Sequence, residues 1–251
     1  MTMTDSNLNY IYILDSTLLK DPALFEFWYQ KMKSQRKAAI DAFKADGARR
    51  LSLAAGILLE KALEAAGVTD YELETRGRGK PYLKGREDIF FNISHSKDVA
   101  ILGISDAEIG VDVEKLRHFK DSLKRYVFLP EELSLAKELS AGETGPDSQN
   151  RLPGKNESLN EEMILTRFWT AKEAVMKYSG KGMALEPKNI LLGLLEDKSD
   201  ASSAAERLLA PEIKDFESAD LRIKSFYYKE DYVLSVCSEN VISFSIKEIT
   251  I

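Results

Sequence analysis

Two acidic residues lie two positions apart in an otherwise apolar segment. GVDVE, residues 110–114, places Asp112 and Glu114 on either side of Val113. Side chains of a strand alternate between its faces, so both carboxylates would point the same way and the valines the other way. Like charges on one face repel each other unless solvent or a cation compensates them. Taken alone, such a DxE pair is most simply a solvated strand end.

A second segment carries an acid and lysines at helical spacing. In TRFWTAKEAVMKYSGKG, residues 166–182, a helix would place Trp169, Glu173 and Lys177 on one face, with Lys172 beside them. A surface ion pair between Glu173 and Lys177 is the modest interpretation, worth about 0.3–0.5 kcal/mol. The apolar residues around them predict a largely buried helix instead, in which charged groups need a partner.

Together the two segments supply three carboxylates with lysines nearby. Asp112, Glu114 and Glu173 suit a hard cation such as Mg²⁺ or Mn²⁺, which takes oxygen ligands and can share its shell with phosphates. A single cysteine and two histidines disfavour a zinc site. In RGRGKPYL, residues 76–83, glycines and basic residues could bind an anion, although the GxxxxGK[ST] spacing of a phosphate loop is absent. These features predict a polyphosphate ligand.

Composition narrows the class of protein. The chain has 251 residues and a formal net charge of -6, so nothing overall favours nucleic acid or an anionic membrane. One cysteine excludes an intramolecular disulfide and suits a reducing, cytoplasmic location. The N-terminus shows no signal-peptide pattern, and no apolar stretch reaches the roughly 20 residues that span a bilayer.

Periodicity and turn residues predict an α+β fold with antiparallel sheets, because helices and short strands are mixed in both halves. Residues 140–160, rich in Gly, Pro, Ser and Asn, predict an exposed insertion loop. We expect helices at 22–45, 47–66, 120–139 (with a new start at Pro130) and 161–178, strands at 9–14, 89–93, 98–104 and 110–114, a hairpin at 223–239 and a final strand at 241–249.

Four ordered motifs resemble those of the 4′-phosphopantetheinyl transferase family, in its larger, pseudo-dimeric, surfactin-synthetase-activating type. They are GRGKPYL, FNISHS, GVDVEK and FWTAKEAVMKYSGKGM, and the resemblance covers roughly residues 48–183. It implies two similar α+β halves about a pseudo-twofold axis, which we place at 1–113 and 114–251. It also implies transfer of the phosphopantetheine arm of coenzyme A to a serine of an apo acyl or peptidyl carrier protein of fatty-acid, peptide or polyketide synthesis, with release of 3′,5′-ADP.

The resemblance also implies a set of site residues. Metal ligands are expected at Asp112, Glu114 and Glu173, and catalytic roles at Glu173, Glu114 and Lys177. Ser34 stands where relatives often carry a lysine, and Lys33 could replace it. Coenzyme A contacts are expected at Lys80, Pro81, Ser94, His95 and Asp112, at Lys172 and Lys177 near the pyrophosphate, at Lys37 near the 3′-phosphate, and at Arg50 as a phosphate-binding arginine.

Two questions of mechanism stay open in the sequence. The carrier serine needs a base, and Glu173 or Glu114 could serve, directly or through a metal-bound water. His95 is the other tempting base, but the resemblance places it at the nucleotide end of coenzyme A. Competing readings are another Mg²⁺-dependent phosphotransferase, which would carry a Walker or kinase signature not found here, and a non-catalytic module that binds coenzyme A or carrier proteins.

A basic run follows the paired carboxylates. KLRHFKDSLKR, residues 115–125, stands out in an acidic chain and could be a solvated helix face or a docking surface for an acidic carrier protein. The chain is long enough to build both halves of the cleft, so we expect a monomer. The basic residues of this run are Lys115, Arg117, Lys120, Lys124 and Arg125.

Overall fold

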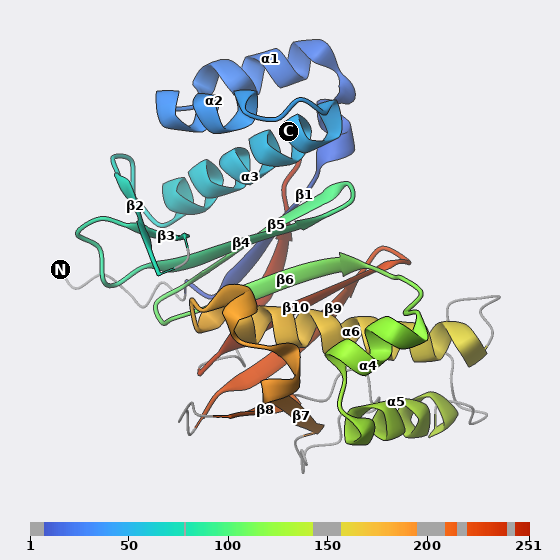
Figure 1. Cartoon of the computed structure of the whole chain (residues 1–251). Helices are drawn as coiled ribbons and strands as arrows, with labels where there is room; N and C mark the ends of the chain where they lie inside the picture. Colours follow the sequence, from blue (N-terminus) through green and yellow to red (C-terminus); the bar gives the residue numbers. More distant parts are fainter. Residues whose placement is uncertain (1–7, 78, 143–156, 195–208, 215–219, 240–243) are drawn as a thin grey trace.

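Two sheets and their helices make up the computed structural model (Figure 1). It describes residues 8–77, 79–142, 157–194, 209–214, 220–239 and 244–251. The mixed order of helices and mainly antiparallel strands confirms the predicted α+β class. The predicted insertion at 140–160 lies mostly outside the described residues. No helix in the described ranges is long and apolar enough to cross a membrane.

The first sheet combines strands from both ends of the chain. Its order is β11-β1-β5-β4, and only the β1–β11 pair is parallel. The middle of β1 is continuously buried and β5 is wholly buried, so this sheet lies at the centre of the N-terminal core. The strands are β1 (Tyr10–Asp15), β4 (Phe90–Ser96), β5 (Val99–Ser105) and β11 (Ser245–Glu248).

Helices α1 (Pro22–Lys31), α2 (Ser34–Asp41) and α3 (Asp46–Ala65) lie on one side of this sheet (Figure 1). Asp21 caps α1, since its Oδ1 accepts hydrogen bonds from two backbone N–H groups of the first turn. The predicted helix 22–45 is broken, because Met32 and Lys33 are extended. No glycine or proline marks that break. Met32 is 4% exposed and lies against Gly56 of α3, so tertiary packing accounts for it.

The second sheet has the order β6-β10-β9-β8-β7 and is antiparallel throughout. Helix α6 (Glu157–Tyr178) packs on β6 and β10, with α4 (Asp121–Val127) and α5 (Pro130–Gly142) beside it. Pro130 begins α5, as predicted. The strands are β6 (Gly110–Lys115), β7 (Ile190–Leu194), β8 (Leu209–Ile213), β9 (Arg222–Tyr228) and β10 (Tyr232–Ser238).

The sheets meet at β4 and β6, which are edge strands of their respective sheets. Val111 and Val113 of β6 point into an apolar cluster that joins both sheets, as the alternation predicted. The predicted boundary between residues 113 and 114 falls inside β6, whereas the sheets divide just before β6 and β11 returns to the first sheet. A separate hairpin of β2 (Leu73–Arg76) and β3 (Lys80–Leu83) lies between α3 and β4 along the chain.

Candidate active site

Helix α6 covers the acidic face of β6 because the strand begins with a glycine. A Cβ on Gly110 would lie 2.0 Å from the carbonyl oxygen of Ala174 and 2.4 Å from the backbone nitrogen of Tyr178. Only glycine allows so close an approach of helix and strand. The face of β6 that carries the two carboxylates therefore lies against the face of α6 that carries Glu173 and Lys177.

Asp112 and Lys177 form an ion pair at the centre of this contact. Lys177 Nζ lies 2.7 Å from Asp112 Oδ1 and 2.7 Å from Ser94 Oγ, and Ser94 Oγ in turn donates to the same Asp112 oxygen at 2.7 Å. Asp112 is buried, at 5% exposure, and its Oδ2 has no hydrogen-bond partner among the described residues. A buried carboxylate oxygen without a partner is costly, so it is a natural position for a cation or a donor from a ligand.

Both carboxylate oxygens of Glu114 accept hydrogen bonds, one from β4 and one from α6. Ser96 Oγ of β4 donates to Oε2 at 2.7 Å, and Trp169 Nε1 of α6 donates to Oε1 at 3.3 Å. Each carboxylate oxygen can accept a further contact, because an ionised carboxyl has about four acceptor positions. Glu114 thus has a defined orientation and spare acceptor capacity.

Glu173 shares the electrostatic environment of the other two carboxylates. Burial raises its pKa to about 7, the negative charges of Asp112 and Glu114 add to the rise, and Lys177 opposes it. Within the described residues, Glu173 makes no hydrogen bond that would fix its carboxylate. The three acids predicted as one group therefore do lie within electrostatic reach of each other.

The three carboxylates are of the type that binds a divalent cation, but their side chains are not arranged around one common point. Among the residues that the structure describes, no group of three or more His, Cys, Asp or Glu side chains is arranged to hold a metal ion. The unpartnered Oδ2 of Asp112 and the mutual repulsion of the acids fit a hard cation that would join them. Asp112, Glu114 and Glu173 remain the predicted ligands.

The contacts of Lys172 give no support to its predicted place near the pyrophosphate. Its side chain is fully buried on the other side of α6, and Nζ lies 2.6 Å from Glu132 Oε2. The carbonyl oxygens of Val127 and Pro187 accept its other two protons at 3.0 and 2.9 Å. An ammonium has three donors and all are used, so none is left for a ligand.

The ammonium of Lys80, a residue predicted to contact coenzyme A, is engaged by groups within the chain. Its Nζ lies 2.6 Å from Glu108 Oε1, 2.7 Å from the Ile109 oxygen and 2.8 Å from the Lys177 oxygen. Burial lowers its pKa, although the charge of Glu108 opposes this. Lys80 therefore fastens β3 to the C-terminal end of α6 and to the start of β6.

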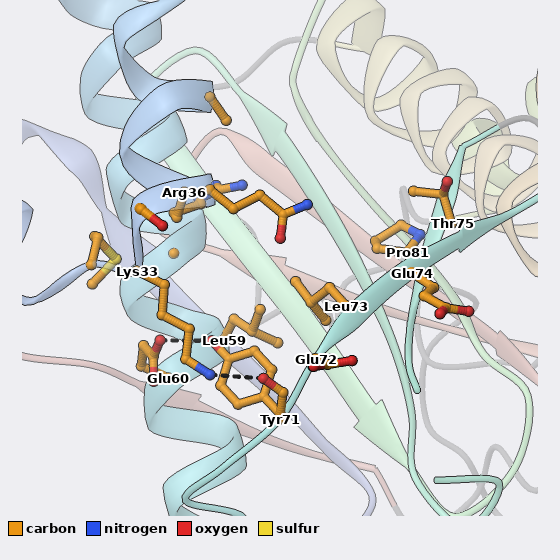
Figure 2. A pocket seen from close by; sticks show the side chains of 15 residues that line it. Lys33, Arg36, Leu59, Glu60, Tyr71, Glu72, Leu73, Glu74, Thr75 and Pro81 are labelled. Atoms are coloured by element: carbon orange, nitrogen blue, oxygen red, sulfur yellow. Dashed lines mark hydrogen bonds between the residues drawn. The ribbon is translucent and has the colours of Figure 1, made fainter. Parts of the chain in front are cut away.

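A cavity of about 540 Å³ opens between α2, α3 and the β2–β3 hairpin (Figure 2). Pro81, a predicted coenzyme A contact, lines this cavity. Lys37 does not line it, and its Nζ donates a hydrogen bond to the backbone carbonyl oxygen of Gln30 at 3.1 Å. Arg36, which the sequence did not single out, lines the cavity, and its Nε is buried without a partner in the described chain. The Nε of Arg50 is also buried and also has no hydrogen-bond partner in the described chain. Lys33 Nζ donates a hydrogen bond to the backbone carbonyl oxygen of Tyr71 at 2.8 Å across the cavity (Figure 2).

His95 lies next to the acidic cluster on the exposed side of β4. Loss of hydration is the first cause that lowers its pKa, and the positive charges of Lys177 and Arg36 act in the same direction. Its imidazole is therefore neutral at neutral pH, and it can donate one hydrogen bond and accept another.

The basic run after β6 is only partly free. Lys115 pairs with Asp231 at 2.9 Å and Lys124 with Glu161 at 2.8 Å. Both pairs are partly exposed, so each is worth little to stability. The side chains of Arg117, Lys120 and Arg125 are exposed.

Comparison with known proteins decides the family. The family model for the 4′-phosphopantetheinyl transferase superfamily matches residues 108–237, which is more than half of the chain and includes β6 and α6. The chain belongs to this superfamily. The resemblance seen in the four motifs is thereby confirmed, and the acidic face of β6 and the Glu173–Lys177 face of α6 lie within the matched region.

Several members of the superfamily resemble the chain in sequence. The transferase HetI of Nostoc sp. is 36% identical over 46% of this chain and 42% of its own length. Sfp of Bacillus subtilis is 26% identical over 68% of this chain and 64% of its own length. AcpT of Salmonella typhimurium is 32% identical over 57% of this chain and 65% of its own length. Each match spans less than two thirds of the relative.

Proposed function

We propose that the protein transfers the 4′-phosphopantetheine arm of coenzyme A to a serine of an apo carrier protein and releases 3′,5′-ADP. The observation that carries the proposal is the junction of β4, β6 and α6. There an ammonium and three carboxylates face each other inside the region matched by the superfamily. Such a mixed cluster suits a pyrophosphate and a divalent cation.

The proposed step is an in-line displacement at phosphorus. The oxygen of the carrier serine forms a bond to the phosphorus of the phosphopantetheine phosphate. The bond from that phosphorus to the bridging oxygen breaks, and its electron pair leaves with 3′,5′-ADP. Lys177 would donate hydrogen bonds to the pyrophosphate oxygens. The residues that would hold Mg²⁺ or Mn²⁺ are Asp112, Glu114 and Glu173, and the cation would neutralise charge on the phosphates.

Glu173 is the better candidate for accepting the proton of the carrier serine. Both oxygens of Glu114 already accept hydrogen bonds from Ser96 and Trp169. Glu173 has no such bond in the described chain and lies beside the same cluster. If one oxygen of Glu173 faces the cation, its other oxygen could accept the proton of an incoming hydroxyl, as general-base catalysis requires.

The cavity beside the cluster is the proposed site for the nucleotide end of coenzyme A. Arg36 and Pro81 line it from opposite sides (Figure 2), and Arg36 lies close enough to His95 to lower its pKa. Arg36 supplies a positive charge there that the predicted Lys37 does not. The groups of the site come from one chain, which favours action as a monomer, and the single cysteine favours the cytoplasm.

Intact mass of an apo carrier protein tests the proposal. The carrier is incubated with this protein, coenzyme A and Mg²⁺, and a parallel sample contains a chelator. We expect the carrier to gain one phosphopantetheine arm in the first sample and none in the second. No gain on fatty-acid, peptide or polyketide carriers, despite tight binding of coenzyme A, would contradict the proposal and favour a non-catalytic binding module.

A further inference from the structure

The edge strands β4 and β6 are joined by side chains and not by a backbone ladder. Asn92 Oδ1 accepts the backbone N–H of Val111 at 2.9 Å. Ser94 Oγ donates to Asp112 at 2.7 Å, and Ser96 Oγ donates to Glu114 at 2.7 Å. We call Asn92, Ser94 and Ser96 the polar seam.

The polar seam follows from strand periodicity. Its three members are alternate residues of β4, so they lie on one face, and each contacts a different part of β6. Ser96 Oγ also accepts the backbone N–H of the residue after Glu114, at 3.3 Å. Ser96 thus contacts both the carboxylate of Glu114 and the backbone that carries it, and this double contact resists rotation of the side chain.

Trp169 of α6 also donates a hydrogen bond to the carboxylate of Glu114. Its indole N–H reaches Glu114 Oε1 at 3.3 Å from α6, while Ser96 takes Oε2 from β4. An indole N–H is a donor only, so it can donate to Glu114 but cannot itself be a ligand of a metal ion. The two donors approach different oxygens, so together they fix the plane of the carboxylate.

We propose that Ser96 and Trp169 are positioning residues that hold Glu114 in the orientation used for divalent-cation binding and phosphopantetheine transfer. The inference rests on the proposed function for its activity readout, but its cation readout is independent of any carrier. Side chains that orient a ligand carboxylate typically change metal affinity or activity by about 10- to 100-fold when removed.

The experiment compares Ser96→Ala and Ser96→Thr with the wild type, using Mn²⁺ as the probe and paramagnetic resonance to measure its binding. We expect Ser96→Ala to raise the Kd for Mn²⁺ about tenfold or more and to lower kcat, with little change in the KM for coenzyme A. Ser96→Thr keeps a hydroxyl and should restore most of the binding. Trp169→Phe keeps a ring without the N–H and should weaken Mn²⁺ binding in the same way.

Matched controls are available for both substitutions. Ser105 is a buried serine of β5 that bonds to Asn9 at 2.7 Å, and Trp28 is a partly buried tryptophan whose Nε1 has no partner in the described chain. Ser105→Ala and Trp28→Phe should leave the Kd for Mn²⁺ unchanged. If Ser96→Ala loses folding, Trp169→Phe tests the same carboxylate from the other side.

A double-mutant cycle shows whether Ser96 acts through Glu114. In a Glu114→Gln background, Ser96→Ala should cause no further loss of Mn²⁺ binding. An undiminished further loss would overturn the inference, as would folded Ser96→Ala and Trp169→Phe variants with wild-type Kd and kcat. A wild type that binds Mn²⁺ through this arrangement but modifies no carrier would contradict the proposed function and leave the positioning role standing.

Discussion

Lys172 and Lys177 lie five positions apart on α6 and contact different parts of the protein. Lys177 faces Asp112 at the junction of the sheets, whereas Lys172 is buried against Glu132 of α5. Five residues correspond to about one and two fifths turns of helix, so the two side chains leave from different sides. Both are lysines in the same motif, and only the packing of α5 on α6 distinguishes the structural residue from the site residue.

Substitution of Lys172 by methionine should therefore act on stability and not on binding. It leaves the buried Glu132 without its cation, and we expect about 3–5 kcal/mol less free energy of unfolding. Urea denaturation measures this, with the exposed Lys137→Met of α5 as control. A Lys172→Met variant of normal stability with a raised KM for coenzyme A would return this lysine to the substrate site.

The sequence predicted which site residues share a face wherever the period of a strand or helix decides this. Asp112 and Glu114 share a face because they are two apart on a strand, and Glu173 and Lys177 because they are four apart on a helix. Lys80 and Arg36 were not predictable, because their roles depend on Glu108 and on the wall of a cavity built by other segments.

At the scale of elements, the packing of α6 on β6 brings the acids and the ammonium together. This packing depends on Gly110, where a side chain would meet the backbone of α6. The sequence predicted both elements but not their contact, since nothing in GVDVE marks its glycine as a helix-packing position. The break between α1 and α2 was missed for a similar reason: it depends on the burial of Met32 and not on a breaker residue.

Gly110→Ala should displace α6 from β6. We expect a loss of about 1–3 kcal/mol or more in the free energy of unfolding, and a larger loss of transfer activity because Lys177 moves away from Asp112. Gly193→Ala on β7 is the control, because a Cβ there would meet its nearest neighbour, the Ala210 oxygen, at an ordinary 3.9 Å. Equal thermal stability and activity in both variants would show that the close approach is not required.

At the scale of the whole molecule, polar contacts tie the two sheets together around the proposed site. Lys80 connects the β2–β3 hairpin to the end of α6, and Lys229 of the β9–β10 turn pairs with Asp15 at the end of β1. The C-terminal β11 pairs with β1 in the first sheet. These connections hold the junction of β4 and β6 from several sides.

Lys80→Met should loosen this arrangement. The Ile109 and Lys177 carbonyl oxygens would lose a buried donor, at a cost of about 1–3 kcal/mol. Hydrogen exchange should increase at the C-terminal end of α6, with a lower Tm. Lys84→Met, at an exposed lysine just after β3, should change neither. Normal exchange in Lys80→Met together with weaker coenzyme A binding would instead support the direct contact first predicted for Lys80.

The exposed basic residues after β6 are the proposed docking surface for an acidic carrier protein. Lys120→Glu combined with Arg125→Glu should raise the KM for the carrier several-fold and leave coenzyme A affinity intact, because opposite charges promote the encounter. Lys188→Glu combined with Lys214→Glu makes the same change of charge near the β7–β8 edge and serves as control. Equal carrier kinetics in both double variants would exclude this docking surface.

We propose that the carboxylates and the ammonium between β6 and α6 perform phosphopantetheine transfer. The most direct test is the intact mass of an apo carrier protein after incubation with coenzyme A, Mg²⁺ and either wild type, Glu173→Ala or Glu162→Ala. Glu162 is on the same helix but pairs with His118. We predict a gain of one phosphopantetheine arm with the wild type and Glu162→Ala and none with a folded Glu173→Ala. Full modification by Glu173→Ala would contradict the claim.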